Sequence, residues 1–481
     1  MAMLGKRRPR RERSGVSGLQ GRQPQSKPVA PGDDQAQGLR IERLAHDGRG
    51  VAHDATGKAL FVEGALTGER VEVAVHRTRK RFDEAHVREV LEASPERVEP
   101  PCAYYARCGG CDLQHLAVPA QRRHKQAVLV DLLARQGIVV DGEPELLAGT
   151  GQGYRRRARL GVKIDAEGQL HLGFRARHSH RLVDIEHCTI LVPELDALLV
   201  PLHRQVASLQ APRQVGHLEL LASDQGVTLV VRQLKEHAAD REAWLTFGAE
   251  HGLNLARLTG RDAPELEWLT PRPTLSCRVP GVGGELDLGF APGDFLQANA
   301  EVNRRMVATA LDWLDGLADA PLLDLFAGVG NFSLPLASAG ARVTAVEGSP
   351  SMVERLEHNA RANARAPSLS LVARQVDLAE AGAVAALLAE LAPEVVVLDP
   401  PRDGAEEAAR ALVAAPVPRV LYVSCDPATL ARDAAHLLQG GYRVTRIAVA
   451  DMFVHTSHLE SMLLFEHSRT QRQRQGASPD G

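Results

Sequence analysis

A strand that leads directly into a glycine-rich loop and a helix is the feature that most constrains how this 481-residue chain folds. The segment PLLDLFAGVGNFS, at 321–333, is interpreted as a buried strand, a tight loop and a helix start. From about residue 295 onward, strand-like runs alternate with helical stretches. This alternation is typical of a doubly wound sheet that binds ligands at the carboxyl ends of its strands. The sequence therefore predicts an α/β, Rossmann-like domain over residues 295–467.

The loop and the strand that follows it indicate a nucleoside cofactor. The two glycines of the loop allow the backbone to approach a ligand closely, and Glu347 ends the next strand, where a carboxylate can bind ribose hydroxyls. Ser333 occupies the place where a dinucleotide site would have a third glycine, which favours S-adenosylmethionine over NAD. Asp377 and Asp399 follow the third and fourth strands and are further cofactor candidates. The alternative is an ordinary glycine turn with a surface glutamate.

A cysteine ends the next predicted strand, in LYVSCDP at 421–427, after the stiff Asp-Pro-Pro-Arg turn at 399–402. Two prolines in that turn can hold a flat base against a wall. Carbon 5 of uracil is a weak nucleophile, so a thiolate must first add at carbon 6 to generate an enolate that accepts a methyl group. Cys425 suits that role. The alternative is a packed core thiol.

A base must then remove the proton from carbon 5 before the thiol can leave. Glu460, in HTSHLES at 455–461, is the carboxylate best placed for this step. His455 and His458 are competing bases. The local sequence around Glu460, taken alone, favours a surface position.

A second group of cysteines suggests a metal site. Cys102, Cys108 and Cys111 have the spacing C-x5-C-x2-C, and Cys188 can complete a set of four. Four thiolates suit either a [4Fe-4S] cluster or tetrahedral zinc, and unconnected thiols are the alternative. Cys277 is isolated and is interpreted as structural.

Four further segments surround the catalytic domain. We expect a disordered basic tail over 1–35, a small β-barrel of about five strands over 36–95, an α+β middle domain over 96–294 and a disordered tail over 468–481. The helical segment within 114–145 is expected to pack with the catalytic domain.

The charge pattern places any RNA contact in local patches, because the formal net charge of the chain is -3. One patch is HRTRKRF at 76–82 in the barrel; the other combines the RRRAR run at 155–159 with Arg175, Arg177 and Arg181. Each is either a phosphate-binding surface or an ordinary solvated strand. The six cysteines favour a reducing compartment, hence the cytoplasm, and no apolar run of 18 residues indicates a membrane span.

Taken together, the motifs resemble the RNA uracil-C5-methyltransferase family over about residues 36–467. The matching segments are CAYYARCGGCDLQHL, YRRRARL, FLQANAEVNRRM, DLFAGVGNF, VEGSP, LDPPR, SCDPATLARD and HTSHLESMLLF. A barrel followed by four such cysteines is similar to the branch of the family that methylates one defined uridine of 23S ribosomal RNA. The resemblance thus implies 23S rRNA as partner, and we expect a monomer.

The resemblance also implies residue roles. The barrel is then a TRAM domain, the metal centre is a [4Fe-4S] cluster, Cys425 is the nucleophile and Glu460 is the base. Asp426 follows the nucleophile where many relatives carry asparagine. The implied cluster ligands are Cys102, Cys108, Cys111 and Cys188, and the implied cofactor residues are Gln297, Phe326, Asn331, Glu347, Asp377 and Asp399.

Two other functions compete with this interpretation. A methyltransferase acting on a nucleobase amine would need the Asp-Pro-Pro motif but not Cys425. An RNA-binding assembly factor would keep the fold without catalysis, and failure to bind S-adenosylmethionine would favour it.

Overall fold

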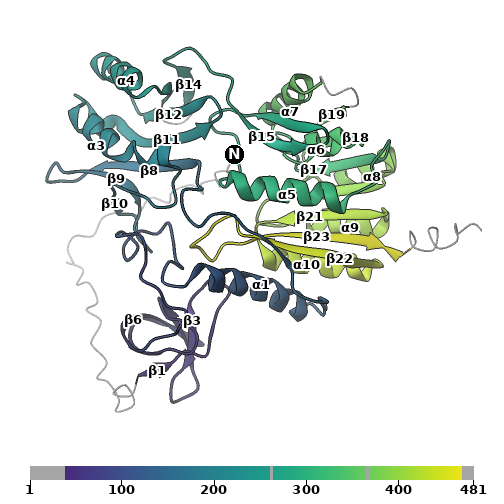
Figure 1. Ribbon diagram of the computed structural model, residues 1–481, viewed down its shortest axis with the longest axis horizontal. Helices are drawn as coiled ribbons and strands as arrows, with labels where there is room; N and C mark the ends of the chain where they lie inside the picture. Colours follow the sequence, from purple (N-terminus) through teal and green to yellow (C-terminus); the bar gives the residue numbers. More distant parts are fainter. Residues whose placement is uncertain (1–37, 261–263, 365–368, 469–481) are drawn as a thin grey trace, which may run out of the picture.

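The computed structural model describes residues 38–260, 264–364 and 369–468. Figure 1 shows three parts: a small barrel, a middle sheet with its helices, and a larger α/β domain. The predicted tails lie outside the described residues, apart from Ser468. No helix in the described ranges is both long enough and apolar enough to cross a membrane.

The α/β domain is built on an eight-stranded sheet with the order β19-β18-β17-β20-β21-β23-β22-β7. The first five of these strands are parallel, and β23 pairs antiparallel with both β21 and β22. The strands are β17 (Pro321–Leu325), β18 (Arg342–Glu347), β19 (Ser370–Gln375), β20 (Val395–Leu398), β21 (Arg419–Ser424), β22 (Tyr442–Ala450), β23 (Glu460–His467) and β7 (Glu145–Leu147). This arrangement confirms the doubly wound sheet.

Helices cover both faces of this sheet because its central strands are apolar on both sides. All four residues of β20 and all six of β21 are buried, as expected of parallel strands between two helical layers. The helices are α5 (Ala300–Trp313), α6 (Ser333–Ser338), α7 (Pro350–Ala362), α8 (Ala383–Leu391), α9 (Glu406–Ala414) and α10 (Pro427–Gln439).

The helical segment after the cysteine loop packs onto the α/β domain. Helix α1 (Val118–Arg135) buries Leu129 and Leu133 in the core that also contains Leu437 of α10. Lys125, 1% exposed, donates to Asp451 at 2.7 Å. Strand β7 then pairs in parallel with β22 at the sheet edge.

The N-terminal part is a six-stranded β-structure with the order β1-β5-β6-β4-β3-β2. Its strands are β1 (Leu39–Arg40), β2 (Arg43–Leu44), β3 (Gly50–His53), β4 (Ala59–Glu63), β5 (Arg70–Thr78) and β6 (Phe82–Glu92). Arg97 binds the fully buried Glu69 through two hydrogen bonds, which ties the exit of the barrel to its core. The predicted basic segment at 76–82 forms the exposed tip of the β5–β6 hairpin.

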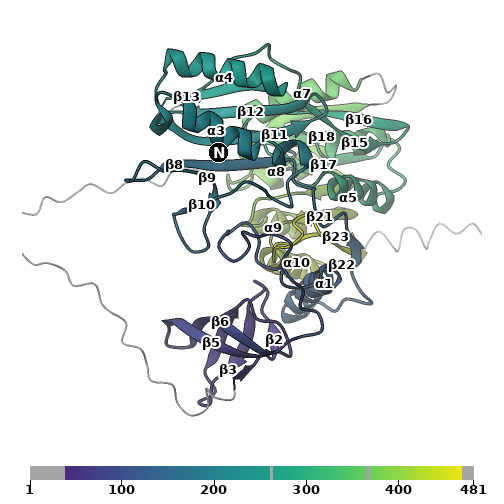
Figure 2. The same ribbon diagram turned by 60° about the vertical axis from the view of Figure 1, so that its left-hand side comes forward.

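The middle part contains a seven-stranded sheet with the order β10-β9-β8-β11-β12-β13-β14. Its elements are β8 (Arg157–Ile164), β9 (Leu170–Arg175), β10 (Leu182–Asp184), α2 (Pro193–Asp196), α3 (Leu199–Ser208), η2 (Pro212–Gln214), β11 (Val215–Ser223), β12 (Gly226–Gln233), α4 (Ala238–His251), β13 (Asn254–Thr259) and β14 (Glu265–Trp268). Figure 2 shows this sheet and its helices above the barrel. A hairpin of β15 (Ser276–Gly281) and β16 (Gly284–Gly289) follows and packs against α5, α6 and α7.

Candidate active site

The glycine-rich loop after β17 has one open side and one closed side. Phe326, Gly328 and Gly330 have φ angles of 64°, 56° and 99°, in the region that favours glycine. A Cβ on Gly328 would meet no atom within 4 Å, whereas one on Gly330 would lie 2.5 Å from Leu356 Cδ1 of α7. Gly330 therefore allows the loop to pack on α7, and the loop is open to a ligand near Gly328.

Glu347 borders the open side of this loop, at the end of β18. Its carboxylate accepts hydrogen bonds from the backbone N–H of Gly328, at 3.1 Å, and from that of Ser349, at 2.9 Å. The carboxylate is therefore held in a fixed orientation at the carboxyl edge of the sheet. Glu347 is the last residue of β18, as predicted, and its cofactor role stays a prediction.

A buried carboxyl that the sequence interpretation missed lies beneath the loop. Asp324 in β17 is 1% exposed, accepts a hydrogen bond from Ser333 Oγ, and has an Oδ1 without a partner among the described residues. Burial, with the charges of Asp399 and Glu347, raises its pKa to about 7. The sequence did contain a signal for this buried carboxyl, because Asp324 is an acidic residue inside the otherwise apolar run LLDL.

The other predicted cofactor residues lie in different settings. Asn331 in the loop exchanges two hydrogen bonds with Asn303 of α5, at 2.8 and 3.0 Å, a partner that the sequence did not indicate. Gln297 is 7% exposed, and its carbonyl accepts from Arg156 Nε at 2.8 Å. Asp377 is exposed two residues beyond the end of β19. Asn331 and Gln297 are thus held in place by side chains from outside the loop.

Cys425 and Glu460 are brought together by the antiparallel pairing of β21 with β23. Ser424 pairs with Ser461 in the register, so Cys425 and Glu460 occupy the next opposed positions. Glu460 is only 5% exposed, so the surface position favoured by its local sequence is wrong. The expectation failed because the burial of Glu460 depends on a strand partner about 35 residues earlier in the chain.

These two groups share an environment that contains a carboxyl and a guanidinium. Burial, with the Glu460 and Asp399 charges, raises the pKa of the Cys425 thiol to about 11, while Arg402 lowers it. Burial and Asp399 raise the pKa of Glu460 to about 8, again opposed by Arg402. Burial raises the pKa of Asp399 to about 7. Arg402, for which the sequence indicated no role, is therefore a cation of this site.

The residue after Cys425 caps a helix. The Asp426 carboxylate accepts from the backbone N–H groups of Ala428 and Thr429, at 3.0 and 3.1 Å, at the start of α10. Cys425 therefore lies directly before a capped helix N-terminus, whose partial positive charge favours a thiolate.

The two histidines have different positions. His455 is 4% exposed; its Nδ1 contacts Gln121 Nε2 at 3.1 Å, and its carbonyl accepts from Asp112 N and Leu113 N. It thereby connects the C-terminal loop to α1 and to the cysteine loop. His458 is exposed and packs edge-on against Phe453. Neither histidine is among the main causes of the pKa shift of the Cys425 thiol.

The four predicted metal ligands come from two segments that meet beside the middle sheet. Cys108 forms a β-bridge with Ala176 after β9. Cys111 and Cys188 pack against one small cluster of Tyr154, Ile190 and Val454.

The thiols are close enough to affect one another. Burial raises the pKa of Cys111 to about 12, and the charges of Cys188, Cys108 and Cys102 raise it as well. Within 38–260, 264–364 and 369–468, however, no group of three or more His, Cys, Asp or Glu side chains is arranged to hold a metal ion.

The arginines of the predicted basic patch at 155–159 mostly contact other parts of the protein. Arg156, 8% exposed, donates to Gln297 O, and Arg157 pairs with Glu219 and donates to Asp294 O at 2.6 Å. Both arginines therefore connect the start of β8 to the segment 294–297, which leads into the catalytic domain. The phosphate-binding role is therefore wrong for these two, because their partners lie in segments that only the fold brings near.

The chain belongs to the tRNA (uracil-5-)-methyltransferase family, whose model matches residues 119–468, and residues 35–87 match the TRAM domain. The fold agrees with this class. A solved structure from Pyrococcus abyssi, tRNA (uracil-54, C5)-methyltransferase in complex with S-adenosyl-L-homocysteine, superposes with a TM-score of 0.70 at 22% identity, over 89% of this chain and 100% of that one.

Two similar proteins are named 23S rRNA (uracil(1939)-C(5))-methyltransferase RlmD. The protein from Halomonas elongata is 61% identical over 100% of both chains. The protein from Chromohalobacter salexigens is 56% identical over 96% of this chain and 95% of its own. These similarities confirm the predicted family.

Proposed function

We propose that this protein transfers the methyl group of S-adenosylmethionine to carbon 5 of uridine 1939 in 23S ribosomal RNA, the reaction named for its relatives. The observation that supports this chemistry best is the opposition of Cys425 and Glu460 across β21 and β23, beside Asp399 and Arg402. A methyltransferase acting on an amine would have no use for a buried glutamate facing a thiol.

The cofactor suits the carboxyl edge of the sheet. The open side of the loop at Gly328 leaves room for a ligand, and Glu347 is oriented there by two backbone N–H groups. When bound, S-adenosylmethionine supplies an electrophilic methyl group. The residues proposed to hold it are Gln297, Phe326, Asn331, Glu347, Asp377 and Asp399.

Cys425 opens the reaction. Its thiolate adds to carbon 6 of the uracil ring, and the electrons of the double bond between carbons 5 and 6 become available for bonding at carbon 5. Arg402 and the N-terminus of α10 favour the thiolate, opposing the burial that raises the pKa of the free thiol.

Glu460 closes the reaction. Its carboxylate accepts the proton of methylated carbon 5, the electrons of that C–H bond restore the double bond, and the bond from carbon 6 to sulfur breaks to release Cys425 as a thiolate. Burial of Glu460 keeps water away from this transfer. No further reactant is needed.

The RNA contact is proposed for the space between barrel and middle domain. A groove of about 630 Å³ there is lined by Arg49, Arg175, Arg177 and His178, and also by the carboxyls of Asp47, Glu63 and Asp112. Arg49 pairs with Asp47 and His178 with Glu63. Arg175 and Arg177 form no ion pair among the described residues and are therefore the cations proposed to meet the phosphate backbone. The target uridine would be turned out of the RNA toward Cys425, at a cost of a few kcal/mol.

We propose a [4Fe-4S] cluster on Cys102, Cys108, Cys111 and Cys188. Support comes from the donor set, four thiols that affect one another, and from the packing of Cys111 and Cys188 on one cluster. The cluster would connect the cysteine loop to the middle domain. Brown protein containing iron and sulfide after purification without oxygen is the expected result, and colourless protein with stoichiometric zinc would contradict it.

The function is tested with labelled S-adenosylmethionine and 23S rRNA from a strain that lacks this gene. We expect one 5-methyluridine, mapped by mass spectrometry to position 1939. Label on another base would overturn the chemistry, and label on another RNA alone would overturn the substrate. The monomeric state and the cytoplasmic location stay predictions.

A further inference from the structure

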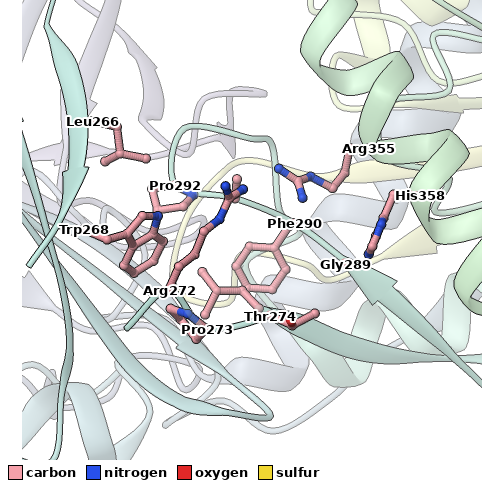
Figure 3. Close-up of a pocket in the computed structure, with 12 residues that line it drawn as sticks. Leu266, Trp268, Arg272, Pro273, Thr274, Gly289, Phe290, Pro292, Arg355 and His358 are labelled. Atoms are coloured by element: carbon pink, nitrogen blue, oxygen red, sulfur yellow. The ribbon is translucent and has the colours of Figure 1, made fainter. Parts of the chain in front are cut away.

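A cavity of about 280 Å³ lies between the middle domain and α7 (Figure 3), and neither Cys425 nor Glu460 lines it. Its walls come from β14, from the segment that leads into β15, from the segment after β16, and from α7. None of the residues proposed for chemistry or for the cofactor lines it. The cavity is therefore a separate feature of the fold.

Part of the cavity lining consists of apolar rings. Trp268, Pro273, Phe290 and Pro292 line it, and Trp268 lies on β14, the edge strand of the middle sheet. Trp268 is partly exposed. An indole beside proline rings offers a surface on which a planar heterocycle can stack.

The opposite side is cationic. Arg355 and His358 extend from α7, and Figure 3 shows the Arg355 guanidinium pointing toward the side where Arg272 lies. Asp294 is 3.5 Å from Arg355, whose Nε has no hydrogen-bond partner in the described part of the chain. Among the described residues, Arg272 forms no ion pair. The cations are thus only partly neutralised, which favours an anion between them.

We propose that this cavity binds a single unstacked nucleotide of the substrate RNA, with its base on Trp268 and its phosphate at Arg272 and Arg355. The inference rests on the proposed function, which supplies an RNA. The volume lies just below the range of about 300 to 1,000 Å³ typical of small-molecule sites, so it suits one nucleotide rather than a helix.

The position of the cavity explains why a nucleotide there would matter. Phe290 and Pro292 line it, Asp294 pairs with Arg355, and the same segment continues to the buried Gln297. A nucleotide in the cavity therefore contacts the chain that carries a proposed cofactor residue. It provides a second anchor for the RNA besides the turned-out uridine.

The test measures RNA binding and methylation in Arg272→Gln and Trp268→Ala. With a 23S rRNA fragment containing the target, we expect each variant to bind about tenfold more weakly. Arg272→Gln should also lower the slope of log Kd against log salt by about 0.7, the value for one phosphate contact of a single strand. KM for RNA should rise about tenfold, with kcat and S-adenosylmethionine binding unchanged.

Arg361→Gln is the matched control, because Arg361 is an exposed α7 arginine outside the cavity. Trp268→Leu keeps an apolar side chain for packing but cannot stack, so it should bind as weakly as Trp268→Ala while unfolding at the wild-type temperature. Kd values and salt slopes equal to those of Arg361→Gln would overturn the proposal. So would binding of free uridine monophosphate in the cavity with unchanged RNA affinity.

The binding readout keeps this inference separate from the proposed function. Wild type that binds the fragment without methylating it would overturn the function, while the Arg272 and Trp268 variants would still decide the cavity.

Discussion

Cys425 and Cys111 are both partly buried thiols, and their pKa values are raised to about 11 and about 12. Burial is the largest cause for each, but their neighbours differ. Glu460, Asp399 and Arg402 act on Cys425, whereas Cys111 is affected by Gln114 and by three other thiols. A thiol among carboxyls and a guanidinium can exchange protons and attack carbon, while thiols among thiols can share a metal. The different neighbours therefore agree with the two different roles that we propose for these thiols.

The largest expected effect is on the nucleophile. Cys425→Ala should lower methyl transfer by at least about 10³-fold, because no other group in the site can add to carbon 6. The rate of label transfer to rRNA measures this loss. Cys277→Ala is the control, since Cys277 is a buried thiol of β15, 3% exposed, and this variant should keep the wild-type rate. Equal rates for Cys425→Ala and wild type would favour an amine as the methyl acceptor.

Substitution of the proposed base, Glu460, should reduce activity less than loss of Cys425 and should leave a distinct product. Glu460→Gln should slow turnover by about 10² to 10⁴-fold, the usual contribution of a general base. Because carbon 5 keeps its proton, a covalent complex between Cys425 and RNA should accumulate and be visible on a denaturing gel. Glu466→Gln, on the same strand and paired with Arg443, should form no such complex. A slow variant without the complex would place Glu460 at an earlier step.

The pH dependence should report the same glutamate. The pKa of Glu460 is raised to about 8, so the carboxylate that acts as base is the minor form below that pH. The rate should therefore rise most steeply below about pH 8, where both the Glu460 carboxyl and the Cys425 thiol, whose pKa is raised to about 11, lose protons. Above that pH it should rise less steeply, because only the thiol still titrates. Single-turnover rates from pH 6 to 9 measure this, and Glu460→Gln should remove the change of slope near pH 8. A rate that falls with rising pH over this range would contradict the assignment.

The sequence predicted the positions of residues on the fold where these positions depend on continuous local patterns. The strand, glycine loop and helix at 321–333 are contiguous, as are Glu347 at the end of β18 and Cys425 after β21. Parallel strands in a doubly wound sheet bring their carboxyl ends together, so strand ends alone were informative. The metal site indicated by the cysteine spacing stays a prediction.

The sequence failed where a role depends on a partner far along the chain. Glu460 is buried by the β21–β23 register, and Arg156 is used by Gln297 at 2.8 Å. Asp324 is an exception, because it lies within a motif that the sequence analysis recognised. The apolar pattern of a buried strand does not explain why a carboxyl is placed there. Its role depends on Asp399 and Glu347, which approach only in the folded sheet.

The cysteine loop should matter less for the reaction than for the fold. If the proposed cluster is present, Cys111→Ser should lose its iron and lower the unfolding temperature. Methyl transfer should fall less than about tenfold, because no residue of the loop is among the main causes of the Cys425 pKa shift. Iron analysis, thermal unfolding and the label assay measure the three quantities. A loss of activity as large as that of Cys425→Ala, in protein that remains folded, would break the comparison between the two kinds of thiol.

The smallest expected effect concerns the acid beneath the loop. The pKa of Asp324 is raised to about 7 in the folded protein from an ordinary 3.8, so the folded state favours the protonated form. Its contribution to stability is complete below pH 4 and is lost as the pH rises through about 7. This pKa shift contributes at most about 4 kcal/mol to the free energy of unfolding.

Asp324→Asn cannot ionise, so its free energy of unfolding should change less between pH 5 and 8 than that of wild type, by about 2 to 3 kcal/mol. Urea unfolding at both pH values measures this, with Asp312→Asn, an exposed α5 carboxyl, as the control. The same pH dependence in all three proteins would mean that Asp324 is already ionised in the folded state. Raised carboxyl pKa values at this edge of the sheet would then be left to Asp399 and Glu460.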